Sequence, residues 1–398
     1  MNRFALTGAR VWTGDGEAFD GHVIVSNGII ERVAQGACAE ALPRVDLSGY
    51  SLSPGMIDLM VMGGFDRSIL RDDPLDIAKE YLRLGVTSCQ FCIGTLPWDS
   101  MVKVATNIWR ALSCRECDSA RVLGVYCEGP FQQPHLTGAS LRDFALEPSP
   151  ENVERLLADM GNAITMVNVA PGLPGDAEAV TRLVASGKIV SMAHSDAPAE
   201  RVFRCVEAGT TVLGHAWDNN SGRIGDSGVQ QPTIEHVAMT DERIRYLHVI
   251  ADGVHVHPVM MRLLLRARGS GALCLVTDAV TRAGMPDGPY VWDDGRRFFK
   301  SGGVGRTDTG WLCGSATLLP DMFRNYVNFT GLPPHEAIRA VTGNPAASLG
   351  MSDEIGHIAA GHIADLVAWD SHLRVRRVWR QGVEISNVSS YGEVEISP

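Results

Sequence analysis

The stretch IVSMAHSDAPAERVFRCVEAGTTVLGHA, residues 189–216, decides the fold. It begins with an apolar run at 189–194, continues through the helix-period segment AERVFRCVEAG, and closes with a second apolar run at 211–216. A strand, a helix and a second strand in this order predict two parallel strands joined by a crossover helix. Each run also carries a histidine at or next to its end, His194 and His215.

The same alternation extends in both directions along the chain. Eight apolar runs read as strands, at 55–61, 86–93, 121–128, 164–170, 189–194, 211–216, 246–251 and 273–278. Helix-period segments such as DIAKEYLRLG and ENVERLLADMG separate them. Eight strands that alternate with helices predict a (β/α)8 TIM barrel, whose active site forms at the carboxyl ends of the strands.

Both ends of the chain have a different pattern. Alternating apolar and polar residues with turn signals predict short strands before residue 53 and again after residue 355. Because separated β segments of this kind bury their apolar faces by pairing with each other, we expect a small β-sandwich domain from residues 1–53 and 355–398. The barrel then occupies residues 54–354.

Composition narrows the classes of function. The apolar runs in this 398-residue chain are about six residues long at most, far short of the ~20 that span a bilayer, so no membrane segment is expected. The start of the chain lacks the pattern of a secretory signal, and the nine cysteines lie mostly in apolar runs, which favours a cytoplasmic protein with reduced thiols. A net charge of −11 argues against nucleic acid as a partner, and an anionic substrate would need local positive groups.

Two CxxC pairs raise the alternative of a structural zinc site. They are Cys89 with Cys92, and Cys114 with Cys117. Strand alternation points the side chains of the first pair to opposite faces, which disfavours a shared metal.

Polar residues gather at the predicted strand ends. Glu128 closes the third strand, while His194 and His215 lie at the ends of the fifth and sixth. One carboxylate and two imidazoles that meet there are a ligand set for one divalent cation with open positions for water and substrate. Each residue alone is more often a hydrogen-bonded core side chain, so the prediction depends on all three together.

Asp278 closes the eighth strand. A carboxylate at this position is suited to accept a proton from an attacking water and to return it to a departing nitrogen, which an amide requires. The structural alternative is a cap on the following segment.

Several motifs together resemble the N-acetylglucosamine-6-phosphate deacetylase family of the amidohydrolase superfamily. They run nearly end to end, as LSPGMIDL at 52–59, CEGPF at 127–131, VSMAHSDA at 190–197, GHAWDNN at 214–220, IADGVHVHP at 250–258, LVTDAV at 275–280 and LCGSATLL at 312–319. The resemblance implies that Glu128, His194 and His215 bind the metal and that Asp278 is the general base and acid. It also implies a homodimer.

The resemblance further implies a set of substrate-binding residues. Arg223 and His255 match positions that hold the sugar phosphate, and Asp218 and Asn219 match a loop that orients the substrate. For Arg223 and His255 the alternatives are a surface salt bridge and a packed loop histidine. We favour anion binding, because a guanidinium pairs well with phosphate oxygens.

The sequence departs from the family pattern in three places, of which the first indicates a single metal and the other two point to altered substrate specificity. Met60 and Met62 replace the His-x-His that holds a second metal in many amidohydrolases, and thioethers bind hard divalent ions poorly. Ser140 stands where the family has a histidine that polarises the substrate carbonyl, and His135 is a possible substitute. Gly172 replaces an acidic residue.

We therefore predict a metal-dependent hydrolase that removes the N-acyl group of an anionic amino sugar, N-acetylglucosamine 6-phosphate or a relative. Zinc is the favoured metal, with iron, manganese and cobalt left open. The alternatives are an amidohydrolase for another amide in a biosynthetic pathway and a catalytically silent barrel. A cavity without converging positive charge would favour the first alternative, and a chain that binds no metal would favour the second.

Overall fold

The computed structural model describes residues 3–114, 117–220, 223–224, 228–292, 295–308, 310 and 312–388. Its main body is a barrel of eight parallel strands in sequence order around the ring. The strands are β6 (Met56–Val61), β9 (Val86–Ile93), β10 (Arg121–Cys127), β11 (Ile164–Asn168), β12 (Ile189–Met192), β13 (Val212–Leu213), β16 (Tyr246–Val249) and β17 (Leu273–Leu275). The predicted (β/α)8 fold is confirmed.

The barrel closes between its first strand and the segment that follows its last. Val61 of β6 bridges Ala279 in parallel, and the Met62 amide donates to the Ala279 carbonyl at 3.1 Å. Beside this bridge, the Thr277 hydroxyl donates to the buried Asp58 carboxylate at 2.6 Å. Closure therefore places residues 277–279 at the mouth of the barrel.

A helix follows each barrel strand and covers it from outside. In chain order these helices are α1 (Pro74–Arg83), α2 (Trp98–Ala111), α3 (Pro150–Met160), α4 (Asp176–Ala185), α5 (Ala199–Ala208), α6 (Ile234–Thr240), α7 (Pro258–Arg268) and α8 (Leu319–Thr330). Local signals explain where they begin: Asp73 caps α1, and Ser149 caps α3 just before a proline at its first position. Two short helices, α9 (Pro334–Ala337) and α10 (Gly343–Ser348), complete this set.

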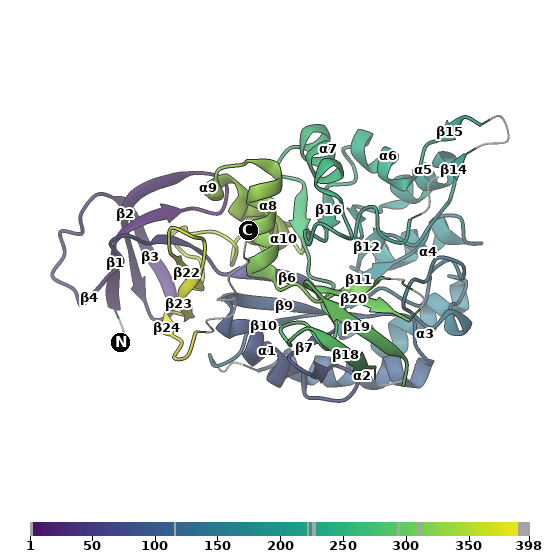
Figure 1. Ribbon diagram of the computed structural model, residues 1–398, viewed down its shortest axis with the longest axis horizontal. Coiled ribbons are helices and arrows are strands. Elements are labelled where there is room, and N and C mark those ends of the chain that lie inside the picture. The colour runs from purple at the N-terminus through teal and green to yellow at the C-terminus, as the bar shows by residue number, and fades with distance from the viewer. Residues whose placement is uncertain are drawn as a thin grey trace.

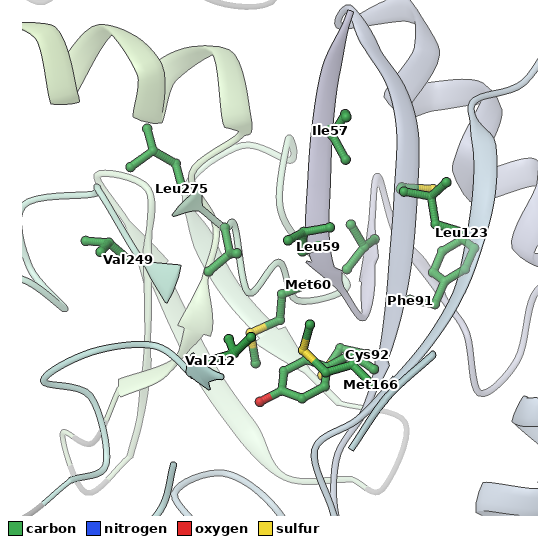
Figure 2. Packing of buried hydrophobic residues seen from close by; sticks show 14 of the residues in the cluster. Ile57, Leu59, Met60, Phe91, Cys92, Leu123, Met166, Val212, Val249 and Leu275 are labelled. Atoms are coloured by element: carbon green, nitrogen blue, oxygen red, sulfur yellow. The ribbon is translucent and has the colours of Figure 1, made fainter. Parts of the chain in front are cut away.

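The barrel interior is packed with apolar side chains. All eight residues of β9 are buried, as expected of a strand covered on both faces. Figure 2 shows Met60, Cys92 and Met166 pointing into this interior. Met60 is thus a core residue rather than a replacement metal ligand.

Strands from both ends of the chain pair in one mixed sheet, which forms one end of the molecule (Figure 1). They are β1 (Arg3–Trp12), β2 (Ala18–Ser26), β3 (Ile29–Gln35), β4 (Arg44–Asp46), β5 (Ser51–Pro54), β22 (Leu366–Trp369), β23 (Val375–Arg380) and β24 (Val383–Glu384). The two ends meet where β5 pairs antiparallel with β22. We propose that the barrel domain begins just after β5 and ends before β22, near the predicted boundaries.

This terminal sheet is attached to the barrel by apolar and ionic contacts. Trp369 of β22 packs on Phe323 of α8, with ring centroids 5.3 Å apart. Arg380 and Asp365 form a buried ion pair at 3.0 Å, and the same guanidinium donates to the Ser119 carbonyl just before β10. The sheet and the barrel are thus packed against each other.

A four-stranded antiparallel insertion follows the last barrel strand. It consists of β18 (Gly288–Val291), β19 (Arg297–Ser301), β20 (Val304–Thr307) and β21 (Leu312–Ser315). Two strand pairs lie in other loops, β7 (Gly63–Gly64) with β8 (Arg67–Ser68), and β14 (Arg223–Ile224) with β15 (Gln230–Gln231). No described helix has the length and apolar character needed to cross a bilayer.

Candidate metal centre and its cavity

Three side chains from three barrel strands meet at the mouth of the barrel. Glu128 directly follows β10, and His194 and His215 each lie two residues beyond β12 and β13. Glu128 Oε1 is 2.9 Å from the Nε2 atom of each histidine, and the two Nε2 atoms are 3.0 Å apart. All three residues are buried. In the described parts of the chain they form the one group of three or more His, Cys, Asp or Glu residues close enough to share an ion.

The surroundings of the two imidazoles orient their ligand atoms. His194 Nδ1 donates to the Leu136 carbonyl at 2.7 Å, and His215 Nδ1 donates to the Asp218 carbonyl at 3.0 Å. With the protons held at Nδ1, both Nε2 lone pairs face each other and a carboxylate oxygen. Such a cluster of lone pairs is stable only with a positive charge among them, so these residues fit a divalent metal ion.

Without an ion, protons on the imidazoles supply the positive charge that this cluster needs. Burial works against charge on Glu128, but hydrogen bonds from protonated Nε2 atoms of His194 and His215 outweigh it and hold its pKa well below the usual range. Burial likewise opposes charge on His215, yet Glu128 raises the pKa of this imidazole to about 10. The Glu128 carboxylate is thus ionised and attracts a cation.

Asp278 lies at the end of the eighth strand region and faces the cavity. It is buried, and its Oδ1 atom has no hydrogen-bond partner among the described residues. Burial and then the negative charge of Glu128 raise the pKa of Asp278 to about 7. A carboxyl group that titrates near neutrality can both accept and donate a proton.

Backbone geometry turns two of these side chains into the cavity. His194 and Asp278 have φ angles of 55° and 48°, in the left-handed region that non-glycine residues seldom adopt. Such conformations cluster at functional sites, where the surrounding structure holds them. At both positions the chain leaves its strand, and the side chain points into the cavity at the barrel mouth.

A cavity of about 760 Å³ lies above these residues, and its two sides differ in chemistry. The side that we call the polar half comprises Asp218, Asn219, Asn220 and His255, from the loops after β13 and β16. The side that we call the apolar half comprises Met62, Ile69, Leu70, Ile93, Leu96 and Leu141, from the loops after β6, β9 and β10. Glu128, His194 and Asp278 also line the cavity.

His255 in the polar half is held by a buried carboxylate. Its Nδ1 is 2.5 Å from Asp252 Oδ2, while Asp252 Oδ1 accepts from the Val254 and His255 amides at 2.8 Å. Burial opposes charge on His255, but Asp252 outweighs it and raises the pKa of this imidazole above its ordinary value. Nε2 of His255 has no partner among the described residues, so its proton is free for a ligand.

The other predicted substrate residues lie around the same cavity. Asp218 and Asn219 line it, and the Asn219 side-chain amide donates to the Asp218 carboxylate at 2.9 Å. His135 also lines it but is largely exposed and pairs with Asp196 at 3.1 Å. Arg223 lies in β14, and its side chain is outside what the structure describes.

The residues that depart from the family pattern have local explanations. The Ser140 hydroxyl lines the cavity and accepts from the Thr95 amide at 3.2 Å, which leaves its own proton available. Gly172 has a φ of 96°, and a Cβ atom there would lie 2.7 Å from the Gln133 side-chain nitrogen. Gln133 therefore occupies the space that an acidic residue at 172 would enter.

Sequence reasoning missed three features of the site. It did not identify Asp252 as the partner of His255, although the two are only three residues apart. It treated Cys92 only as half of a CxxC pair, whereas its thiol lies 3.8 Å from Glu128 Oε2. It also missed the β18–β21 insertion, whose Trp292 and Arg296 reach the cavity, Arg296 donating to the Ala139 carbonyl at 3.1 Å.

The sequence is similar to known proteins over most of its length. Residues 52–394 match the model of the Amidohydrolase family. The chain is 32% identical to the N-acetylgalactosamine-6-phosphate deacetylase of Escherichia coli O157:H7 over 95% of this chain and 98% of that one. It is 30% identical to the N-acetylglucosamine-6-phosphate deacetylase of Vibrio furnissii, over 86% of this chain and 84% of the relative.

The fold is also similar to solved structures. A mutant N-acetyl-D-glucosamine-6-phosphate deacetylase from Mycobacterium smegmatis, in complex with N-acetyl-D-glucosamine-6-phosphate, superposes with a TM-score of 0.87 and 27% identity over 96% of this chain and 99% of that one. The N-acetylglucosamine-6-phosphate deacetylase from Pasteurella multocida gives 0.88 and 26% over 97% and 100%.

Proposed function

We propose that this chain, which belongs to the amidohydrolase family and within it to the N-acetylhexosamine-6-phosphate deacetylases, hydrolyses the N-acetyl group of an N-acetylhexosamine 6-phosphate. The observation that carries the proposal is the cluster of Glu128, His194 and His215, of which Glu128 and His194 line one cavity together with Asp278. These are the groups that amide hydrolysis at neutral pH requires. The products are acetate and the free amino sugar phosphate.

Glu128, His194 and His215 would hold one divalent ion, for which we propose zinc. Iron, manganese and cobalt accept the same ligands and are the alternatives. Such an ion lowers the pKa of a bound water and polarises a carbonyl. The core position of Met60 and the thioether of Met62 support a single metal rather than two.

Asp278 supplies the proton transfers. As a carboxylate it accepts a proton from the water that attacks the acetyl carbon. The same proton then passes to the amide nitrogen as the C–N bond breaks, so the nitrogen leaves as a neutral amine and Asp278 returns to its starting state. A pKa raised towards neutrality by burial suits both steps.

The polar half of the cavity holds the sugar phosphate in this proposal. His255, kept protonated by Asp252, donates from Nε2 to a substrate oxygen, and Arg223 pairs with the phosphate. Asp218 and Asn219 bind sugar hydroxyls. The Ser140 hydroxyl donates to the acetyl carbonyl oxygen, and His135 lies at the rim.

We also propose that the protein is a cytoplasmic homodimer. Exposed apolar side chains at Val254, Val259 and Leu263, on α7 and the loop before it, support a contact between subunits. The mass of the purified protein in solution tests this assembly.

The activity is tested by acetate release from N-acetylglucosamine 6-phosphate, N-acetylgalactosamine 6-phosphate and the two unphosphorylated sugars. We expect turnover of at least one phosphorylated sugar, with kcat/KM at least about tenfold above its unphosphorylated form because charge-assisted contacts are lost without phosphate. Asp278→Asn, which keeps the metal ligands, should lose about 10²–10⁴-fold in kcat. Equal rates from both proteins would refute the proposal.

A further inference from the structure

The two halves of the cavity lie on opposite sides of the barrel. The apolar half comes mainly from the loops after β6 and β9, the first two strands of the ring. The polar half comes from the loops after β13 and β16, the sixth and seventh strands. In a ring of eight, Glu128 and His194, after strands three and five, lie between the two halves on one side, and Asp278, after strand eight, lies between them on the other. The metal ligands and Asp278 therefore separate two chemically different subsites.

The geometry of an amide links these subsites to the two ends of the substrate. An amide is planar and prefers the trans arrangement, so its two substituents leave the carbonyl carbon and the nitrogen in opposite directions. With the carbonyl beside Glu128 and Asp278 and the sugar in the polar half, the acyl chain is directed towards the apolar half. This step rests on the proposed function.

From this arrangement we propose that the apolar half is an acyl-chain subsite that accepts uncharged acyl groups longer than acetyl. The part of this wall that β9 and the loops after β6 and β9 contribute has no charged side chain: its cavity-lining residues are Met62, Ser68, Ile69, Leu70, Cys92, Ile93, Gly94, Thr95 and Leu96. Arg142, next to Leu141 in the loop after β10, also lines the cavity. An acetyl methyl group would leave much of this wall without contact. The cavity of about 760 Å³ also lies in the upper part of the roughly 300–1,000 Å³ range of small-molecule sites.

The residues of this wall have room to contact a ligand. Leu70 is 38% exposed, Leu96 and Leu141 are half-buried, and Ile69 is buried. Burial of one methylene in an apolar site is worth about 0.8 kcal/mol, which is about a fourfold gain in kcat/KM.

The test compares glucosamine 6-phosphates that carry N-acetyl, N-propionyl and N-butyryl groups, with amine release as the common measurement. We expect kcat/KM to rise about fourfold per added methylene from acetyl to butyryl. A kcat/KM for N-butyryl below that for N-acetyl overturns the inference but leaves the deacetylase activity standing. If no N-acyl group is released, the proposed function fails and this inference with it.

A pair of variants locates the subsite. Leu96→Asn keeps the branched shape of the side chain but removes apolar contact, so the ratio of N-butyryl to N-acetyl kcat/KM should fall about tenfold. Leu157→Asn makes the same change on α3, at a side chain that is half-buried like Leu96 but does not line the cavity, and should leave the ratio at its wild-type value. Equal ratios in both variants would overturn the placement, and circular dichroism verifies that both are folded.

Discussion

The polar and apolar halves of the cavity are built by the same repeating unit, a strand followed by a loop and a helix, yet they have opposite character. In the polar half, His255 is buried and fixed by the Asp252 carboxylate through Nδ1. In the apolar half, the loops after β6 and β9 contribute Met62, Leu70 and Leu96, whose apolar contacts impose no orientation on a ligand. One half selects a charged group by orientation, and the other selects by size and hydration.

The two halves should respond differently to mutation. Hydrogen-bonded networks need every partner in place, so a single loss is costly. Apolar walls tolerate exchange as long as volume is preserved. Substrate specificity in this protein should therefore change more readily from the side of β6 and β9 than from the side of β13 and β16.

The largest expected effect comes from a metal ligand between the halves. Glu128→Gln preserves volume but removes a negative charge from the ligand set, so metal content should fall sharply and kcat by about 10³-fold or more. Elemental analysis and acetate release measure both. Met62→Leu in the apolar half is the matched control and should keep the metal content. Full metal content in Glu128→Gln would contradict the assigned ligand set.

A second substitution removes the hydroxyl that contacts the acetyl oxygen in our proposal. Ser140→Ala should reduce kcat by about 10²-fold with little change in KM, because the lost hydrogen bond strengthens as charge develops on the oxygen. Steady-state kinetics separate the two constants. A raised KM with an unchanged kcat would assign Ser140 to substrate binding alone.

A smaller effect is expected from the carboxylate behind the polar half. Because Asp252 raises the pKa of His255, anion binding should persist above the ordinary imidazole range and be lost as pH rises through the raised pKa. Asp252→Asn should shift this alkaline loss to lower pH and raise KM about tenfold at pH 8. A pH profile of kcat/KM tests both effects. An unshifted alkaline limb would mean that Asp252 has only a structural role.

The smallest effect on activity is expected in β6, beneath the apolar half. Burial raises the pKa of Asp58 to about 6, although the Thr277 hydroxyl and amide partly counter this. A raised pKa means that Asp58 contributes stability below pH ~4 and loses this contribution as pH rises through about 6, a change of about 3 kcal/mol. Asp58→Asn should remove that pH dependence while kcat changes little. Unfolding by denaturant at pH 4 and pH 8 provides the comparison, and identical pH dependence in both proteins would refute it.

Much of the fold was predictable because parallel strands buried on both faces are continuous apolar runs. All eight runs became barrel strands, but several are shorter than predicted: the run at 273–278 yields a strand at Leu273–Leu275 only. The chain leaves the ladder early because the strand ends turn outward, with Asp278 in a left-handed conformation. A hydropathy pattern carries no sign of that turn.

The candidate site was predictable where its residues end strands, as with Glu128, His194 and His215. Other features depend on proximity that sequence spacing does not reveal. Leu70 and Leu96 come from different loops, and they line the same wall because the barrel places the ends of β6 and β9 side by side. Trp292 lines the cavity from the segment between β18 and β19. These two strands of the insertion are too short and too polar to be recognised as strands from the sequence pattern.

The antiparallel pairing of β5 with β22 has a consequence for how this protein is made. The sheet cannot be completed until residues 366–384, near the carboxyl end, have been synthesised. Until they emerge from the ribosome, β5 presents an unpaired edge, and Trp369 is absent from the side of α8. Completion of the sheet during synthesis therefore waits for residues 366–369, and a chain that stops before residue 366 leaves this edge of β5 without a partner strand.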